Sequence, residues 1–101
     1  MAIDKEYAAR RYLQSEDVVA REIAGEMLLV PIRNNLGDLE SIYTLNETGA
    51  FLWSRMDGTH TLAEICAAMQ AEFEVGEEEA WVDLLEFVAG LKTIPALVEV
   101  T

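Results

Sequence analysis

The side chains that could carry chemistry are few and isolated in this sequence. His60 is the only histidine and lies in a predicted turn at residues 57–61, without a partner for a metal site or a catalytic pair. Cys66 is the only cysteine, which excludes an internal disulfide and a multi-cysteine metal site. We therefore expect His60 to be an ordinary turn residue and Cys66 to pack as a small hydrophobic side chain.

Local motifs for catalysis and nucleotide binding are also missing. The sequence contains no GxGxxG, GxxxxGK[ST] or GxSxG pattern, so nucleotide binding and serine hydrolysis have no local support. Three consecutive acids, Glu77-Glu78-Glu79, could attract a cation, but adjacent carboxylates on a helix point in different directions. Their position favours a solvated first helical turn that the helix dipole stabilises. We expect no enzymatic activity, no cofactor and no metal site.

Length and charge narrow the class of protein. A chain of 101 residues, with 51% hydrophobic and 26% charged residues, predicts one globular domain. No apolar run reaches the roughly 18 residues of a membrane span, and the first residues lack the apolar region of a secretory signal. We therefore expect a cytoplasmic protein without a membrane partner. Residues 36–101 carry thirteen acidic and only two basic side chains. This imbalance disfavours a nucleic-acid partner and favours basic or neutral partners.

The first part of the chain predicts an antiparallel sheet. Residues 1–16 show no clear period and predict an N-terminal arm or a short helix, ahead of a domain that spans residues 17–101. Two β-favouring runs, residues 18–24 and 27–32, flank Gly25-Glu26 and predict a hairpin with a two-residue turn. Turn formers at residues 34–38 lead into a third strand from Ser41 to Leu45. The prediction is a three-stranded meander.

Asn46 marks the change from strands to helices. Its side-chain oxygen can cap the first turn of a helix predicted over residues 46–56. The segment Thr61-Leu62-Ala63-Glu64 fits a capping box at the start of a second helix. A third helix is predicted over residues 77–92, and residues 96–100 then predict a short final strand or an extended tail. Three strands and a capped helix-turn-helix predict an α+β fold of the winged helix-turn-helix type.

The third predicted helix carries more apolar surface than one core contact needs. Glu79, Asp83, Glu86 and Gly90 form a polar strip, while apolar residues cover about 220° of the circumference. We divide this arc into a side that packs on the other helices and a side that faces the strands or a partner. The first side comprises Ala80, Leu84, Phe87 and Leu91, and the second comprises Trp81, Leu85, Val88 and the stem of Lys92. If the strands do not cover the second side fully, it is predicted to form one wall of an apolar groove.

Four segments together resemble a known family. They are Leu45-Asn46-Glu47-Thr48-Gly49-Ala50 through Trp53, then Asp57-Gly58, Thr61 to Ile65, and Asp83-Leu84-Leu85-Glu86-Phe87-Val88. Over about residues 17–100 the sequence resembles the PqqD family, the peptide-recognition domains (RiPP recognition elements) of ribosomal peptide-maturation systems. The resemblance implies a three-stranded antiparallel sheet followed by three helices. It also implies a non-catalytic peptide chaperone that binds the leader segment of a precursor peptide and presents it to a modifying enzyme such as a radical-SAM protein.

The resemblance places the peptide as an added strand beside the third strand and against the third helix. The strand would offer its unpaired backbone groups, and the second side of the helix would supply the wall. The predicted peptide-binding residues are Ile42, Tyr43, Thr44, Leu45, Trp81, Leu85, Val88 and Lys92. Lys92 could meet a leader carboxylate, whereas the acidic surroundings predict mainly basic contacts. The resemblance leaves open whether the chain serves quinone-cofactor (PQQ) biosynthesis, a lasso-type peptide or another system.

Other functions fit parts of the sequence. The helix-turn-helix spacing is compatible with a winged-helix nucleic-acid-binding or transcription-regulatory protein, although the acidic third helix would face phosphates unfavourably. Glu40-Ser41-Ile42 faintly resembles the attachment motif of acidic carrier proteins, but its serine falls in a predicted strand. A free strand edge could also pair two copies of the chain into a homodimer.

Overall fold

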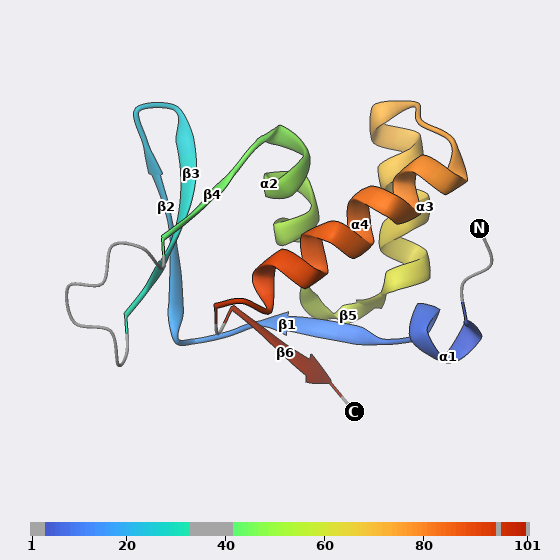
Figure 1. The fold of residues 1–101 in the computed structure, drawn as a ribbon, viewed down its shortest axis with the longest axis horizontal. Coiled ribbons are helices and arrows are strands. Elements are labelled where there is room, and N and C mark those ends of the chain that lie inside the picture. The colour runs from blue at the N-terminus through green and yellow to red at the C-terminus, as the bar shows by residue number, and fades with distance from the viewer. Residues whose placement is uncertain (1–3, 33–41, 95, 101) are drawn as a thin grey trace.

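The computed structural model describes residues 4–32, 42–94 and 96–100 of the chain. These residues form an α+β fold with two antiparallel three-stranded sheets (Figure 1). The elements along the chain are α1 (Lys5–Ala8), β1 (Arg11–Gln14), β2 (Val18–Ile23), β3 (Glu26–Pro31), β4 (Tyr43–Leu45), α2 (Glu47–Ser54), β5 (Asp57–Thr61), α3 (Leu62–Phe73), α4 (Glu77–Leu91) and β6 (Leu97–Val100). The predicted α+β class, with a three-stranded antiparallel sheet followed by three helices, is confirmed.

The first hairpin is the one predicted, with its turn shifted by one residue. β2 and β3 pair out to Ile23 and Glu26, so the two turn residues are Ala24 and Gly25. Both have positive φ angles, 53° and 84°, as a type I′ turn requires. Glycine adopts this conformation without strain, whereas the Cβ of Ala24 is sterically strained there. The two strands still pair, but each residue of β2 faces a partner two positions earlier in β3 than the predicted turn implies, and Glu26 lies in β3 instead of in the turn.

β4 completes this sheet in the order β2-β3-β4. It pairs antiparallel with β3 from Tyr43 to Leu45. Pro31 is the last residue of β3, a position that suits its missing N–H donor. The predicted turn at residues 34–38 and the predicted strand start at Ser41 lie outside the described residues. The three-stranded meander is thus present, with a third strand that is described from Tyr43 onward.

A second sheet, in the order β5-β1-β6, differs from the prediction for both ends of the domain. Over the described part of residues 1–16, the short helix α1 and the strand β1 stand where an arm or a short helix was predicted. β1 is the central strand, and Tyr12 within it is only 2% exposed. The predicted turn that contains His60 is the strand β5. Periodicity does not reveal these strands because they are short and pair with distant segments.

The helix starts follow the capping signals in the sequence. The N–H of Gly49 donates to Asn46 Oδ1 at 2.7 Å at the start of α2. At the start of α3, the N–H of Glu64 donates to Thr61 Oγ1 at 3.1 Å and the N–H of Thr61 donates to Glu64 Oε1 at 2.8 Å, which completes a capping box. α4 begins with the three acids of residues 77–79 in its first turn. These three predicted helix starts are confirmed.

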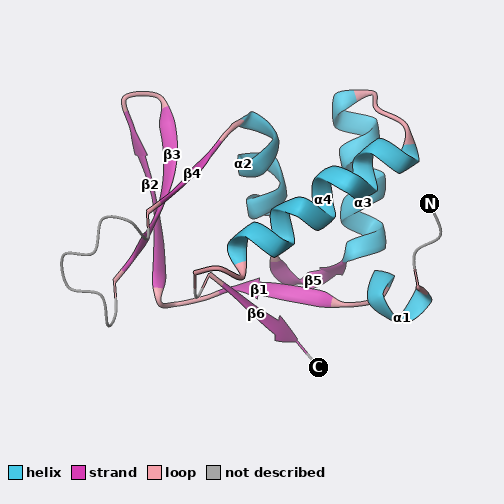
Figure 2. Ribbon diagram, viewed as in Figure 1, coloured by secondary structure: helices cyan, strands magenta, loops and turns pink. Residues whose placement is uncertain are grey.

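One buried core joins the helices to both sheets. Figure 2 shows the helices α2, α3 and α4 in the centre, with the sheet β2-β3-β4 on one side and β1, β5 and β6 below them. The side chains buried almost completely are Tyr12, Leu29, Leu52, Met56, Leu62, Ile65, Cys66, Met69, Leu84, Val88 and Leu91. None of the helices in the described ranges has the length and apolar character needed to cross a membrane.

Candidate functional site

β4 forms an open edge of its sheet, because its one ladder partner within the described residues is β3. The N–H of Ile32 donates to the carbonyl of Asp17 at 2.9 Å, which sets the alternation of hydrogen-bonded pairs along the sheet. Even-numbered residues of β3 therefore bond to β2, and odd-numbered residues bond to Tyr43 and Leu45. Thr44 consequently directs both its N–H and its C=O toward the open edge.

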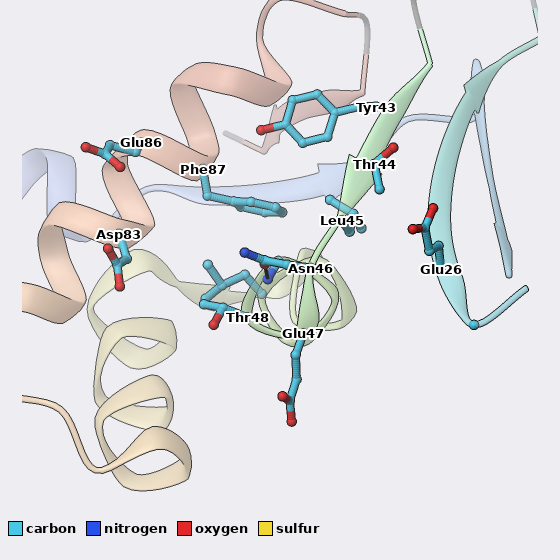
Figure 3. A pocket seen from close by; sticks show the side chains of 13 residues that line it. Glu26, Tyr43, Thr44, Leu45, Asn46, Glu47, Thr48, Asp83, Glu86 and Phe87 are labelled. Carbon is cyan, nitrogen blue, oxygen red and sulfur yellow. Dashed lines mark hydrogen bonds between the residues drawn. The ribbon is translucent and has the colours of Figure 1, made fainter. Parts of the chain in front are cut away.

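A cavity of about 600 Å³ lies beside this edge (Figure 3). Its lining comes from the tip of the first hairpin, from β4, from the start of α2 and from the middle of α4. The lining residues are Gly25, Glu26, Tyr43, Thr44, Leu45, Asn46, Glu47, Thr48, Gly49, Leu52, Asp83, Glu86 and Phe87. Because Thr44 belongs to this lining, an occupant of the cavity could reach its outward backbone groups.

The floor of the cavity is apolar and closely packed. Leu45, Leu52 and Phe87 are all buried, and Figure 3 shows Phe87 directed toward Leu45. A Cβ atom at Gly49 would lie 3.3 Å from Phe87 Cε1 and 3.3 Å from Leu45 Cδ2, tighter than ordinary contact. Glycine at position 49 therefore lets the start of α2 close against the floor.

Four carboxylates stand around the margin of this cavity (Figure 3). Glu26 is the first residue of β3, Glu47 is the first residue of α2, and Asp83 and Glu86 lie about one turn apart on α4. None of the four forms an ion pair or a side-chain hydrogen bond with another described residue. No lysine or arginine belongs to the lining within the described part of the chain. Within the described residues, the margin therefore carries negative charge that no cation of the lining compensates.

Comparison with known proteins places the chain in a family. The model of the family described as coenzyme PQQ synthesis protein D (PqqD) matches residues 26–94, which is more than half of the chain. The chain belongs to the PqqD family. The matched segment runs from β3 to the end of α4, so the PqqD match includes both sides of the cavity.

Two solved structures resemble this PqqD-family fold. Lasso peptide synthetase B1 complexed with the leader peptide has a TM-score of 0.71 and 22% sequence identity, over 87% of this chain and 98% of that chain. TbiB1 in complex with the TbiA(beta) leader peptide has a TM-score of 0.65 and 26% identity, over 80% of this chain and 88% of that chain. No curated protein matches the chain.

The strand residues predicted for the site lie at or next to the cavity of this PqqD-family chain. Tyr43, Thr44 and Leu45 line it, and Ile42 immediately precedes β4, half-buried and outside the lining. Thr44 points its side chain away from the buried Leu45 because successive residues of a strand face opposite sides. The strand side of the cavity therefore coincides with the segment that the sequence indicates, and peptide binding by these residues stays a prediction.

The helix residues predicted for the site lie elsewhere. Trp81 and Val88 are 7% and 1% exposed, Leu85 is half-buried, and none of the three lines the cavity. Lys92 follows the end of α4, and its Nζ lies 5.4 Å from the centre of the Tyr12 ring. Trp81 and Val88 belong to the same buried core cluster as Tyr12, and Leu85 packs against it. A role of Trp81, Leu85 and Val88 as a groove wall for the peptide therefore stays a prediction, and it does not coincide with this cavity.

Asp83, Glu86 and Phe87 form the α4 side of the cavity instead. The helical pattern of the sequence places the first two in a polar strip and Phe87 on the side that packs on the other helices. One residue of the sequence could have indicated this arrangement. Gly90 is a small residue in an otherwise acidic strip, and a glycine inside a helix lets another element approach the helix closely. That element is β4, whose Tyr43 hydroxyl lies against Gly90.

The isolated chemical side chains lie away from the cavity. His60 Nδ1 is 2.9 Å from Asp57 Oδ1 on β5, and the pKa of Asp57 is held well below its usual value, first by the N–H of Thr59 and then by the Thr59 hydroxyl and His60. Cys66 is buried in α3, where burial raises the pKa of its thiol. His60 thus contacts Asp57 within its own strand, and Cys66 packs in the core as predicted.

Proposed function

We propose that this chain is a non-catalytic adaptor that captures the leader segment of a precursor peptide by strand addition to β4. The observation that carries the proposal is the outward direction of the Thr44 backbone groups next to a cavity with an apolar floor. An extended peptide placed there would hydrogen-bond to Thr44 and direct alternate side chains toward the floor. Burial against Leu45, Leu52 and Phe87 would add hydrophobic stabilisation to these bonds.

Family and fold support a leader peptide as the ligand. The chain belongs to the PqqD family, and both solved structures described above are complexes with leader peptides. The segment matched by the family model contains Thr44 and Phe87, which border the cavity from opposite sides. The same segment of the chain thus carries the family match and the geometry required for strand addition.

A modifying enzyme completes the proposed system. In the systems that the PqqD family serves, a leader-binding domain presents the precursor to an enzyme such as a radical-SAM protein, so the chain would contribute binding and positioning. We place this function in the cytoplasm, where ribosomal precursor peptides are made. The quinone-cofactor and lasso-type systems would differ in the peptide that occupies the cavity.

Titration of backbone amides tests the proposal. The probe is the leader peptide encoded by a short precursor gene beside the gene for this chain, added to ¹⁵N-labelled protein. Amides of Tyr43 to Leu45 and of α4 around Phe87 should shift, because these residues border the cavity. A scrambled peptide of the same composition serves as the control. Unchanged amides in both segments at saturating leader concentration would overturn the proposal.

Methylation of the peptide backbone separates strand addition from other binding modes. N-methylation of the leader residue whose N–H faces Thr44 removes a hydrogen bond and should weaken binding about tenfold. Methylation of the next residue, whose N–H points away from β4, should change the affinity by less than about twofold. Loss of affinity at alternate positions along the leader is the expected signature, and uniform loss would contradict pairing to the strand edge.

A further inference from the structure

We infer that the cavity selects a leader segment with two basic side chains at alternating positions, in the pattern Lys/Arg-x-Lys/Arg. The inference rests on the proposed function and adds the chemical class of the peptide to it. The feature that carries it is the set of four carboxylates, without a described lysine or arginine in the same lining, around an apolar floor and next to an open strand edge.

The carboxylates border the cavity from several directions. In the close-up view, Asp83 and Glu86 extend from α4, Glu26 stands on the opposite side beyond β4, and Glu47 lies at the start of α2 (Figure 3). A peptide carboxylate placed within this margin would meet like charge from α4 and from the strands. A basic side chain would meet opposite charge, and no described lysine or arginine of the lining would compete for these acids.

The apolar floor favours lysine and arginine over other polar side chains. Their aliphatic stems can lie on Phe87 and Leu45, both buried at the floor, while their charged ends reach the carboxylates at the margin. A purely apolar side chain would use the floor and leave the acids unpaired. A short polar side chain would use neither fully. Lysine and arginine therefore match both parts of the lining.

The spacing of the acids on α4 matches that of a strand. Asp83 and Glu86 are three residues apart on one helix face, where such side chains lie about 5–6 Å apart at Cβ. Side chains on one face of an extended peptide repeat about every 6.6–6.8 Å, which is two residues. A strand paired to β4 between the hairpin and α4 can therefore place residues i and i+2 opposite Asp83 and Glu86.

Three synthetic peptides test the pattern directly. They share one neutral, β-favouring host sequence and carry Lys-x-Lys, adjacent Lys-Lys, or Gln-x-Gln at its centre, each with a fluorophore for anisotropy. We expect Lys-x-Lys to bind about 3- to 10-fold more tightly than Gln-x-Gln, the range for two partly exposed charge pairs. Adjacent lysines point to opposite faces and should show about half of this gain in free energy. Raising the salt concentration should remove the difference.

Variants of α4 assign the effect to the carboxylates of the cavity. The double variant D83N/E86Q should lose the preference for Lys-x-Lys over Gln-x-Gln. The matched control is E77Q/E79Q, which removes the same number of charges from exposed positions of the same helix outside the lining. The control should keep at least about half of the preference, because a distant surface charge is largely screened. Circular dichroism of both variants checks that α4 is intact.

The outcomes separate this inference from the proposed function. Equal binding of the three peptides, or equal losses in the two double variants, overturns the charge selection. If the leader from the neighbouring gene shifts the β4 amides while Lys-x-Lys does not, the selection fails and strand addition stands. If neither peptide shifts the β4 amides, both the charge selection and the strand addition fail. Tight binding of Lys-x-Lys with shifts at Thr44 and Glu86 that D83N/E86Q abolishes supports both.

Discussion

The hydroxyl of Tyr43 lies directly against Gly90, so a Cβ atom at position 90 would lie 2.5 Å from the hydroxyl oxygen and 3.3 Å from the adjoining ring carbon. Real Cβ atoms do not approach oxygen this closely. The contact joins β4 to α4 beside the cavity, because Tyr43 is one of the lining residues. Glycine in an acidic helix strip therefore sets how closely the open strand approaches the helix.

Gly90→Ala should displace the Tyr43 ring. Alanine favours the helix by about 0.8–1 kcal/mol, which offsets the cost of moving an aromatic side chain, so the free energy of unfolding should change by less than about 1 kcal/mol. The affinity for the leader should fall, because Tyr43 borders the cavity. Tyr43→Phe removes the hydroxyl, and the double variant G90A/Y43F should bind more tightly than G90A alone. Additive losses would contradict the steric explanation.

Asn46→Ala should destabilise the junction of β4 and α2. The side chain accepts a hydrogen bond from the N–H of Gly49 at 2.7 Å, and loss of an N-cap of this kind costs about 1 kcal/mol. Urea denaturation at neutral pH measures the change. Asn46→Asp is the control, since aspartate caps as well as asparagine, and it should retain the stability. A similar loss in both variants would show that the cap is not the cause.

Asp57→Asn should reduce the amount by which the free energy of unfolding falls at low pH. The N–H of Thr59 donates to the Asp57 carboxylate at 2.9 Å and is the first cause of its lowered pKa. A carboxyl with a lowered folded pKa stabilises the protein above its unfolded value, near 3.8, and this contribution disappears as the pH falls through the folded pKa. Urea midpoints measured between pH 6 and pH 2.5 should therefore decline less steeply in the variant. Glu72→Gln, at an exposed position of α3, should keep the steep decline.

Tyr12→Ala should destabilise the whole domain, although the residue lies in the segment predicted as an arm. Tyr12 is 2% exposed in the central strand β1, and removal of a buried aromatic side chain costs about 3–5 kcal/mol. Its neighbour Leu13 is 44% exposed, so Leu13→Ala should cost less than about 1 kcal/mol. Thermal unfolding measures both. Equal, small losses of stability in the two variants would indicate that residues 11–14 form an arm that does not pack in the core.

Local chemistry in the sequence determined the first sheet and the starts of the helices. Gly25 supplies a positive φ angle, Asn46 and Thr61 supply side-chain caps, and each acts within a few residues along the chain. Such signals are read without knowledge of the rest of the fold, because the atoms concerned are close in sequence. The open strand over Tyr43 to Leu45 follows from the same local patterns.

Only the tertiary structure decided which side of α4 borders the cavity. The helix periodicity divides α4 into faces, but the faces that become buried depend on every element packed against them. The sheet β5-β1-β6 is assembled from segments at both ends and the middle of the chain, so its existence cannot be inferred from local patterns. In the folded domain Trp81 and Val88 belong to the buried core, whereas Phe87 and the acids Asp83 and Glu86 line the cavity beside β4.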